Sequence, residues 1–458
     1  MRARVLEAAG GPVFLVGGTL RDVLLEREPA DFDFAVTGSG IACARDFSHR
    51  ALGKLVILSE KDDEARVIAS KRVFDFNGFG EGTIAGDLAR RDFTINAMAC
   101  EVRPDGVGDL LDPHSGRQDL ASGIIRPVSD SSLASDPLRL LRAFRLALEL
   151  GMTVDEAVLE QGSRASLART AGERVNAELL RTMERPGAHD CLQRLHDIGR
   201  LAEILPGFEP ILEDDRLRGH SFRTLFKLEE MIHGESFFSR FEPEWERYFE
   251  GWRADEEDGT GLPFRRAMLK LGGLLHDIAK PQTRFQTTSG ETHFYGHDSL
   301  GARMVERLGR KRLKLSRPQL RMLGTLVQEH MRLHLLATSP DLTDRAVRRF
   351  FRDLGEDAFG MMMLCYADGW ATAGKTYHLE DTITRMIEQK REEDAKLAVE
   401  RFITGHDLIA AGLKPGPAFK VILQELEDLQ VEGKINSREE GLEYLKANMP
   451  GLNGEAQS

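Results

Sequence analysis

Asp31 and Asp33 lie two positions apart in the segment DFDFAV, which is typical of a β-strand. Residues i and i+2 of a strand point to the same face, so we expect the two carboxylates side by side, with Phe32 and Phe34 facing the core. Such carboxylates repel each other unless a cation lies between them, and Mg²⁺ that also binds substrate phosphates is the natural one. The pair therefore indicates a site for phosphoryl transfer, with Asp75 in RVFDF as the predicted third acid.

A glycine pair precedes these acids. Gly17 and Gly18 lie between the apolar segment 13–16, a predicted strand, and the helical segment TLRDVLL. Bare backbone N–H groups at such a turn can hold a triphosphate, and Arg21, one turn into the helix, can reach the same phosphates. A DxD pair alone is more often an exposed strand edge, and a glycine turn alone is a weak signal. Together they favour a nucleotide site.

Four segments occur in a specific order: LVGGTLRDVLL, DFDFAV, DLARRDFTINAMA and DPLRLLRAFRLALELGM. They resemble the class II tRNA nucleotidyltransferase and bacterial poly(A) polymerase family across residues 1–185. The resemblance implies a polymerase-β-like α/β head followed by a helical neck, with Mg²⁺ on Asp31 and Asp33, and with ATP, CTP and RNA 3′ ends as partners. It implies nucleotide contacts by Gly17, Gly18, Arg21, Arg91, Asp92, Asn96, Asp136, Arg139 and Arg142.

The segment that begins at Asp136 departs from the family pattern. Asp136 and Pro137 are a good helix start, with Asp as N-cap, and residues 136, 139 and 142 would then share one face. A carboxylate and a guanidinium held there could read the edge of cytosine or adenine without a template. The family usually has Glu before this aspartate, whereas this chain has Ser135. The side chains of Asp136 and Arg139, which would read the base, are therefore supported differently. Whether this chain switches between CTP and ATP, as the family usually does, is not decided by the sequence.

A second set of residues lies in the helical half of the chain. His276 and Asp277 occur in the apolar segment AMLKLGGLLHDIAKP, which predicts a buried helix, and a buried charge needs partners. The partners that we expect are His220, His297, His330 and Asp368. Imidazole and carboxylate ligands suit Mg²⁺ or a divalent transition metal, and the sequence does not choose among them.

The ordered set resembles the HD metal-dependent phosphohydrolase domain, which some tRNA nucleotidyltransferases carry. The resemblance implies His220, His276, Asp277 and Asp368 as core ligands, and His297 and His330 as extra ligands or phosphate contacts. The implied chemistry is hydrolysis of phosphate esters at RNA 3′ ends, cyclic phosphates included. The alternative is a helical domain that has lost catalysis and binds RNA.

Strand patterns, with further predicted strands at 56–58 and 72–76, dominate up to residue 128 and helical patterns follow, so the fold class is an α/β head with a mostly α-helical remainder. We predict a nucleotidyltransferase head at 1–128, a helical neck at 129–212, an HD domain at 213–400 and a helical, tRNA-binding tail at 401–458. The acidic and aromatic stretch 237–260 is expected to be an insertion or a mobile loop. The tail resembles the C-terminal segment of many tRNA nucleotidyltransferases, and residues 421, 423, 426 and 429 are expected on its apolar face.

The composition is that of a soluble globular protein, with 41% hydrophobic residues and a net charge of −12. No apolar run is long enough to span a bilayer, no signal-peptide pattern begins the chain, and the four cysteines are widely spaced, so we expect a cytoplasmic protein. The stretch 303–321 and the arginines at 139, 142 and 145 form basic clusters that could follow a phosphate backbone or be solvated helix faces. The oligomeric state is open.

Three functions compete on these observations. The first is addition of CCA, or of CC or A alone, to tRNA 3′ ends. The second is poly(A) polymerase activity on general RNA, which the tail disfavours. The third is an RNA phosphohydrolase in which the HD site does the main chemistry and the head merely binds. The third function is disfavoured because three motifs are intact, namely the DxD motif at 31–33, the glycine pair at 17–18 and the RRD segment at 90–92.

Overall fold

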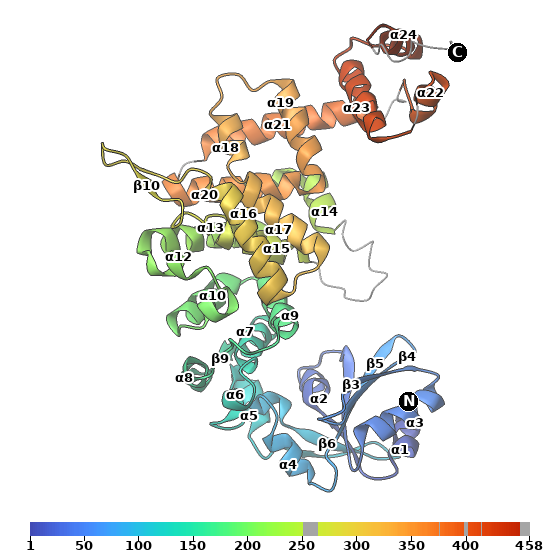
Figure 1. Ribbon diagram of the computed structural model, residues 1–458. Helices are drawn as coiled ribbons and strands as arrows, with labels where there is room; N and C mark the ends of the chain where they lie inside the picture. The colour runs from blue at the N-terminus through green and yellow to red at the C-terminus, as the bar shows by residue number, and fades with distance from the viewer. Residues whose placement is uncertain (251–263, 375, 398–401, 414, 449–458) are drawn as a thin grey trace. The chain divides into compact units, whose positions relative to one another are not determined.

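The computed structural model describes residues 1–250, 264–374, 376–397, 402–413 and 415–448. The chain forms two compact units. The first comprises Met1–Met331 and Phe359–Gly374, and the second comprises Arg332–Ala358 and Lys375–Ser458. The first unit contains the α/β head and most of the helical region, and all the residues that the sequence singled out for chemistry lie in it (Figure 1).

The head is built on a seven-stranded sheet in the order β3-β4-β5-β2-β1-β6-β7. Its strands are β1 (Val13–Val16), β2 (Asp31–Val36), β3 (Lys54–Ser59), β4 (Glu64–Ala69), β5 (Arg72–Gly78), β6 (Ala99–Val102) and β7 (Val107–Leu111). Strands β2 and β5 are parallel, and the other paired neighbours in this sheet are antiparallel. The strands predicted at 13–16, 31–36, 56–58 and 72–76 are all present. Strands β4, β6 and β7 were not predicted.

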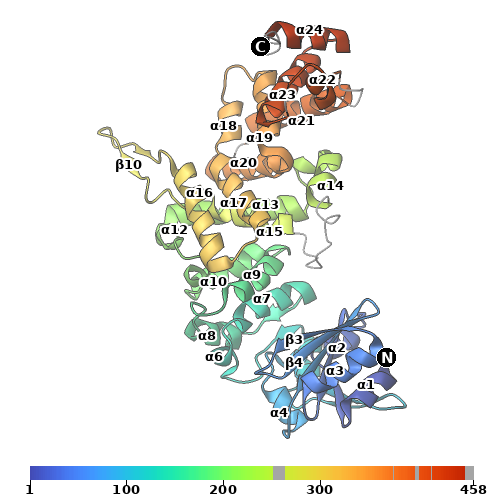
Figure 2. The same cartoon turned by 45° about the vertical axis from the view of Figure 1, so that its right-hand side comes forward.

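Helices α1 (Arg2–Ala9) and α3 (Gly40–Ala51) cover one face of this sheet (Figure 2). Phe47 of α3 packs its ring 5.1 Å from that of Phe74 and 5.2 Å from that of Phe76. Phe34 and Phe74 are buried in the same cluster, and Phe32 is partly buried against it. This apolar face obliges the alternate residues of β2 and β5 to project from the opposite face, where α2 (Gly17–Leu24) follows β1.

The neck follows the head. It begins after α4 (Ile84–Ala89), η1 (Thr94–Asn96), α5 (Gly116–Ser122) and the short strand β8 (Ile124–Ile125), which pairs in parallel with β9 (Thr153–Val154). Its helices are α6 (Ser132–Ser135), α7 (Arg139–Leu150), α8 (Glu156–Arg164), α9 (Gly172–Met183), α10 (Ala188–Asp197), α11 (Leu201–Ile204) and α12 (Glu209–Glu213). Helix α7 buries one apolar side, with Leu140, Leu141 and Phe144 in the core.

The predicted start of α7 differs from the observed one. The helix begins at Arg139, three residues after Asp136, and its N-cap position is Leu138. The Asp136 carboxylate accepts a hydrogen bond from the Leu138 N–H at 3.2 Å. Asp136 therefore caps the turn that leads into the helix and is not itself the N-cap, because its carboxylate bonds an amide two residues on, ahead of the first helical residue.

The region that follows is helical and surrounds the second set of predicted ligands. It contains α13 (Asp215–His233), η2 (Phe237–Arg240), α14 (Glu242–Glu250), α15 (Phe264–Leu275), α16 (His297–Leu308), the π-helical segment Gly309–Leu313, α17 (Arg317–Glu329) and α20 (Ala358–Ala373). A short hairpin, β10 (Phe285–Gln286) and β11 (Thr292–His293), connects α15 to α16.

The expectation of a mobile loop is wrong for the first part of the stretch 237–260. Residues 237–250 form η2 and α14, and the side chains of Phe238, Phe241 and Phe249 are buried. The Phe238 ring lies 5.5 Å from that of Tyr366 and 5.6 Å from that of Phe359. The acidic composition concealed this aromatic packing. Residues 251–260 lie outside the described residues.

The second unit contains α18 (Arg332–Ala337), α19 (Asp344–Leu354), η5 (Gly355–Asp357), α21 (Tyr377–Leu397), α22 (Gly405–Ala410), α23 (Pro417–Val431) and α24 (Arg438–Asn448). The last three helices share a small core that includes Leu408, Ile422, Leu426 and Leu445, with Leu423 and Leu429 packed against it. Val421 is 67% exposed, so its predicted place on the apolar face is wrong. Ile422, one position on, occupies that face instead.

Candidate active site and metal centre

Asp33 and Asp75 are register partners on the parallel strands β2 and β5. Asp31 lies two residues earlier on β2, so the three predicted acids project from one face of the sheet. On the opposite face the intervening residues pack, with the rings of Phe32 and Phe74 stacked 5.4 Å apart. The structure therefore brings the predicted acids together on the side of the sheet that α1 and α3 leave uncovered.

Thr19, which the sequence analysis did not single out, ties α2 to this acidic strand. Its N–H donates to the Asp33 carboxylate at 3.3 Å, and its buried hydroxyl accepts from the Asp33 N–H at 2.6 Å and donates to the Asp31 carbonyl at 3.0 Å. The signal for it was present, because a hydroxyl directly after a glycine pair lies in the first turn of a helix. Thr19 holds Asp33 against the start of α2.

Gly17 occupies the point where the backbone approaches Asp33 most closely. Its φ is +65°, and a Cβ at this position would lie 2.8 Å from the Asp33 Oδ2 atom and 3.0 Å from the Arg91 Nη1 atom. Glycine alone tolerates both the left-handed backbone and the missing space. The glycine turn therefore places N–H groups and the Arg91 guanidinium around one carboxylate oxygen.

The electrostatic environment of the two acids favours a cation. Burial and the nearby Asp75 raise the pKa of Asp33, and Arg91 together with the Thr19 and Gly18 amides counteracts this. Burial also raises the pKa of Asp31. Carboxylates that are costly to ionise in the free protein fit a divalent cation, because the ion offsets both the burial and the mutual repulsion.

Asp75 already has a strong partner. Arg66 of β4 donates from Nε and Nη2 to the two oxygens of Asp75, each at 2.8 Å. Sequence reasoning missed Arg66, because the strand that carries it was not predicted. In this structure Asp75 is held by a bidentate pair, and its service as a third metal ligand stays a prediction.

A chain of hydrogen bonds joins four of the predicted nucleotide contacts. Arg21 donates to the Asn96 Oδ1 atom at 3.0 Å, and Asn96 donates from Nδ2 to the Asp92 Oδ1 atom at 3.1 Å. Arg142 of α7 pairs with the Asp92 Oδ2 atom at 2.8 Å. Burial opposes ionisation of Asp92, but Arg142 and Asn96 outweigh it and lower its pKa. Asp92 is thus an ionised, buried anchor between the head and α7.

The predicted base-reading residues are also engaged. Arg139 donates to the Arg91 carbonyl at 3.1 Å and to the Arg90 carbonyl at 2.7 Å, so it clamps the RRD backbone. Asp136 accepts from Arg174 of α9 at 2.7 Å. Ser135 is exposed, and its hydroxyl donates to the Ser132 carbonyl at 2.7 Å.

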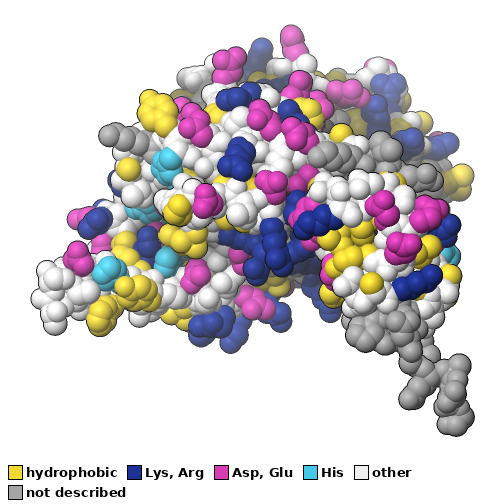
Figure 3. Space-filling model, turned by 90° about the horizontal axis from the view of Figure 1, so that it is seen from above, with side chains coloured by type: hydrophobic (Ala, Val, Ile, Leu, Met, Phe, Trp, Pro, Cys, Tyr) yellow, Lys and Arg dark blue, Asp and Glu magenta, His cyan; other side chains and the backbone are white. Residues whose placement is uncertain are grey.

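The basic clusters divide into buried and exposed members. Arg145 is buried and pairs at 2.5 Å with both Glu149 and Glu178, so its predicted place in a basic track is wrong. Arg312 donates to three backbone carbonyls of the neck. Other basic residues of this stretch are exposed, namely Arg303, Arg307, Lys311, Lys314, Arg317 and Arg321. Lys and Arg side chains also gather in a dense group on the face shown in Figure 3, so the net charge of −12 is not evenly spread.

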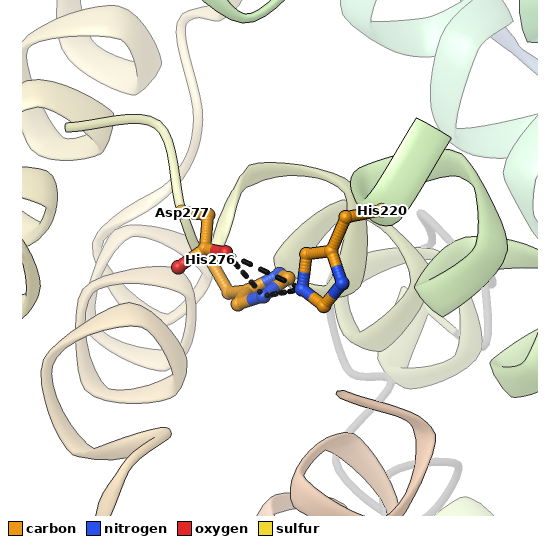
Figure 4. A group of neighbouring side chains, drawn as sticks. All are labelled: His220, His276 and Asp277. Atoms are coloured by element: carbon orange, nitrogen blue, oxygen red, sulfur yellow. Dashed lines mark hydrogen bonds and ion pairs between the residues drawn. The ribbon is translucent and has the colours of Figure 1, made fainter. Parts of the chain in front are cut away.

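The second set of predicted ligands forms a compact buried cluster (Figure 4). His220 comes from α13, and its Nε2 atom lies 3.1 Å from the His276 Nε2 atom and 3.3 Å from the Asp277 Oδ2 atom. Asp368 of α20 completes this group, 3.0 Å from His220. The helix predicted to carry His276 and Asp277 ends at Leu275, and both residues lie in the turn directly after it.

His297 and His330 form a second group around the same aspartate. Their Nε2 atoms lie 3.1 Å apart, and they approach the Asp277 Oδ1 atom to 3.5 and 3.7 Å. The Nδ1 atoms of His276, His297 and His330 each lie 2.7–2.8 Å from the backbone carbonyl three residues earlier. The Nε2 atoms are thereby turned toward Asp277, the arrangement that second-sphere hydrogen bonds impose on metal-binding histidines. Asp277 thus offers one oxygen to each group.

The charges in this cluster also fit a divalent cation. Burial opposes protonation of His276, but Asp277 and Asp368 beside it raise its pKa to about 10. Burial lowers the pKa of His330 to about 4. Lys280 reaches the Asp277 Oδ2 atom at 2.6 Å. The protonated His276 and Lys280 thus compensate the negative charge of Asp277 and Asp368, which a bound metal ion would compensate in their place.

Comparison with known proteins places both sites in context. Residues 13–126 match the family described as Poly A polymerase head domain, and residues 217–358 match the HD domain family. Both domains imply dependence on a divalent metal. No helix among the described residues is long and apolar enough to cross a membrane.

Several curated relatives match over nearly the full length. A CC-adding tRNA nucleotidyltransferase of Geobacter sulfurreducens is 29% identical, covering 97% of this chain and 93% of the relative. An A-adding tRNA nucleotidyltransferase of Deinococcus radiodurans is also 29% identical, covering 94% of each. Among solved structures, a CCA-adding enzyme with CTP has a TM-score of 0.63 at 21% identity, covering 100% of this chain and 94% of the other. The Thermotoga maritima CCA-adding enzyme with tRNA has a TM-score of 0.59 at 21% identity, covering 98% and 94%. The chain therefore combines a Poly A polymerase head domain with an HD domain, is similar to tRNA nucleotidyltransferases over nearly its full length, and is a nucleotidyltransferase.

Proposed function

We propose that this chain adds nucleotides from CTP or ATP to the 3′ end of tRNA without a nucleic-acid template. The observation that carries the proposal is the arrangement around Asp33, with Asp31 on the same sheet face, the Gly17 turn against its carboxylate and Arg91 beside it. Relatives named CC-adding, A-adding and multifunctional CCA proteins support tRNA as the substrate. Which of these products forms is decided by the experiment below.

In this reaction the 3′-oxygen of the RNA bonds to the α-phosphorus of the incoming nucleotide, and pyrophosphate leaves. Asp31 and Asp33 would hold Mg²⁺, which when bound supplies positive charge to the attacking oxygen and to the leaving group. The amides at Gly17–Gly18, with Arg21 and Arg91, bind and orient the triphosphate. Asp92, kept ionised by Arg142, keeps Asn96 and Arg21 in place through their hydrogen bonds.

Base selection in this proposal belongs to the start of α7. Asp136 and Arg139 present an acceptor and donors that match the edge of a cytosine or adenine. In the free protein Asp136 accepts a hydrogen bond from Arg174, and Arg139 donates to the carbonyls of residues 90 and 91. A bound nucleotide would replace these partners. Ser135 supplies no carboxylate to hold the two side chains, so we expect weaker discrimination between CTP and ATP than a Glu at this position would give.

The test offers the full chain three tRNAs that end at the discriminator base, at C74 and at C75, each with labelled CTP or ATP. Incorporation of CMP on the shortest tRNA supports a CC-adding or CCA-adding enzyme. Use of ATP alone, on the tRNA that ends at C75, supports an A-adding enzyme. Long A tails on unrelated RNA would overturn the tRNA assignment in favour of a poly(A) polymerase.

A matched pair of variants checks the catalytic site. Asp31→Asn removes one proposed ligand, and we expect incorporation to fall at least a thousandfold, since a metal-site carboxylate supplies several kcal/mol of transition-state stabilisation. The control is Asp46→Asn on α3, a partly exposed residue that is paired with Arg50, and it should leave the rate unchanged. Survival of activity in Asp31→Asn would show that the proposed metal site is wrong.

A second activity is favoured by one specific observation, the sharing of Asp277 between two groups of imidazoles. We propose that this cluster hydrolyses phosphate esters at RNA 3′ ends, 2′,3′-cyclic phosphates included. Divalent cations bound there would supply a water nucleophile at neutral pH and charge for the phosphate oxygens. The residues of the chain hold the site: Asp277 lies between the two groups, and the backbone carbonyls orient the histidines.

The hydrolysis test uses an RNA that ends in a 2′,3′-cyclic phosphate, in the presence of Mg²⁺, Mn²⁺, Co²⁺, Ni²⁺ or Zn²⁺. We expect the parent and Asp31→Asn to open the cyclic phosphate to a terminal 2′- or 3′-phosphomonoester, and Asp277→Asn to leave it intact. Metal content by elemental analysis should fall in Asp277→Asn. Nucleotide addition should persist in that variant, because the two catalytic clusters share no residue. If the parent neither binds a metal at this cluster nor hydrolyses the RNA, the region serves another purpose.

A further inference from the structure

The hairpin between α15 and α16 carries unusually exposed aromatic residues. Phe285 is 55% exposed and Tyr295 is 72% exposed. Both views of the fold show this hairpin projecting from the helices of the same unit (Figures 1 and 2). Exposed aromatic rings that gather on one short hairpin form a small apolar patch, and such patches mark binding surfaces more often than singly exposed residues do.

Three rings lie on one face of the hairpin. Phe285 of β10 and His293 of β11 are directly opposite each other in the antiparallel pair, so their side chains share a face. Tyr295 lies two positions after His293, and the two rings are stacked, with centroids 5.2 Å apart and planes inclined by 12°. The result is an aromatic face composed of Phe285, His293 and Tyr295.

The ring of Phe294, which lies between His293 and Tyr295 in the sequence, has a different environment. Phe294 is partly buried, with Lys280 5.5 Å and Arg284 5.9 Å from its ring centroid. Arg284 is further held by Asp214, and Lys280 reaches the Asp277 carboxylate. This inner side anchors the hairpin on the metal cluster, whereas the aromatic face on the other side is left to solvent.

The hairpin also joins two groups of the proposed metal cluster. Asp277 precedes it, and His297 lies two residues after Tyr295. The segment that carries the aromatic face is therefore continuous in sequence with two residues of the cluster. Lys280 and Arg284 lie at the base of the hairpin, each paired with an aspartate, and their remaining N–H groups can donate to a phosphate oxygen.

We propose that Phe285, His293 and Tyr295 form a stacking platform for the unpaired nucleotides at an RNA 3′ end and present that end to the His-Asp cluster. The inference rests on the proposed hydrolysis at that cluster. Nucleobases offer flat faces that stack on exposed aromatic rings whatever their sequence, which suits a site that must accept many RNA ends. The bases inside a duplex are stacked on each other and only the terminal pair has a free face, so the platform favours single-stranded termini.

The test compares the parent with the double variant Phe285→Ala/Tyr295→Ala, and with Tyr377→Ala as control. Tyr377 is 76% exposed and lies in the second unit, so it matches the exposure without the location. The first measurement is the ratio of kcat/KM for a single-stranded RNA with a 2′,3′-cyclic phosphate to kcat/KM for glycerol 1,2-cyclic phosphate, which has no aromatic ring to stack. We expect this ratio to fall at least about tenfold in the double variant, through KM, and to stay unchanged in the control.

A second measurement does not depend on hydrolysis. RNA with 2-aminopurine in its last unpaired positions loses fluorescence when the base stacks on an aromatic ring. We expect quenching with the parent and with Tyr377→Ala, and at least about tenfold weaker apparent affinity with the double variant. Blunt duplex RNA should bind the parent and the double variant equally.

The outcomes separate the two proposals. Absence of hydrolysis by the parent, with quenching that the double variant loses, overturns the hydrolase and supports the platform. Hydrolysis with an unchanged substrate ratio and equal quenching in parent and double variant overturns the platform and leaves the hydrolase standing. A hairpin that serves a protein partner would give this second pattern.

Discussion

The Nε atom of Arg142 lies 2.8 Å from the Oδ2 atom of Asp92, and this pair joins the neck helix α7 to the nucleotide side of the head. Asp92 is buried, whereas the Arg142 side chain is 48% exposed. The contact therefore does two things at once. It keeps a buried carboxylate ionised, and it makes the geometry of the RRD segment depend on a helix that begins at residue 139.

Replacement of Arg142 by Ala should leave Asp92 buried beside Asn96 without its main cation. We expect a loss of about 1–2 kcal/mol in stability, less than for a fully buried pair because solvent screens the exposed guanidinium. Nucleotide addition should fall with a raised KM for the triphosphate. Thermal unfolding and steady-state kinetics measure the two effects. The exposed pair Arg164–Glu160 offers the control, since Arg164→Ala should change neither quantity.

Gly17→Ala tests the close approach of the backbone to Asp33. The new Cβ would meet the Asp33 Oδ2 atom at 2.8 Å in a backbone with φ of +65°. We expect incorporation to fall about a hundredfold, because displacement of a reacting group by about 1 Å can cost that much. Gly10→Ala is the matched control, with φ of +61° and nothing within 4 Å of its Cβ. It carries the same backbone strain, about 1 kcal/mol, and should retain full activity.

Ser135→Glu restores the acid that the family usually has before Asp136. The new carboxylate would lie beside Asp136 and near Arg139 and Arg174, so it should alter how the two reading side chains are held. We expect the ratio of kcat/KM for CTP to that for ATP to change by about tenfold, measured on tRNAs that end at the discriminator base and at C75. Ala134→Glu adds the same charge at the neighbouring exposed position. An equal change in both variants would argue for a general charge effect and against a role of position 135 in base selection.

Glu184 predicts a pH dependence of stability. Burial raises the pKa of this carboxyl to about 7, against the stabilising hydrogen bond from the Ala267 amide. In the folded protein it binds a proton that the unfolded chain has already released between pH 4.5 and 7, so its contribution to stability is lost as pH rises through this window. The loss is on the order of 2–3 kcal/mol. Glu184→Gln should flatten the decline in Tm between pH 5 and 8, and a parallel decline in parent and variant would contradict the assignment.

Local pattern was enough for much of the head. The strands at 13–16 and 31–36 follow from short apolar runs, and the side-by-side placement of Asp31 and Asp33 follows from the two-residue period of a strand. The six His and Asp residues of the second site could also be selected in advance, because their types are rare on apolar segments and they occur in a recognisable order.

Predictions made from local composition were wrong where side-chain packing determines the environment of a residue. The acidic stretch from residue 237 contains aromatic rings that are buried against α20, and Arg145 is neutralised by two glutamates and is not part of a basic track. Val421 and Ile422 exchange the expected roles, because which neighbour faces the core depends on the rotation of the helix against its partners.

The order and types of the residues along the chain specify which chemical groups are available: two carboxylates on one strand, glycines before them, and a second set of imidazoles and acids. Tertiary structure decided which groups meet. Arg66 on Asp75, Thr19 on Asp33, Arg142 on Asp92, and Asp277 between two pairs of histidines are contacts across separate strands and helices. Side-chain types and periods are local properties of a chain, but such meetings depend on the register of strands and the packing of helices, which form only when distant segments fold together.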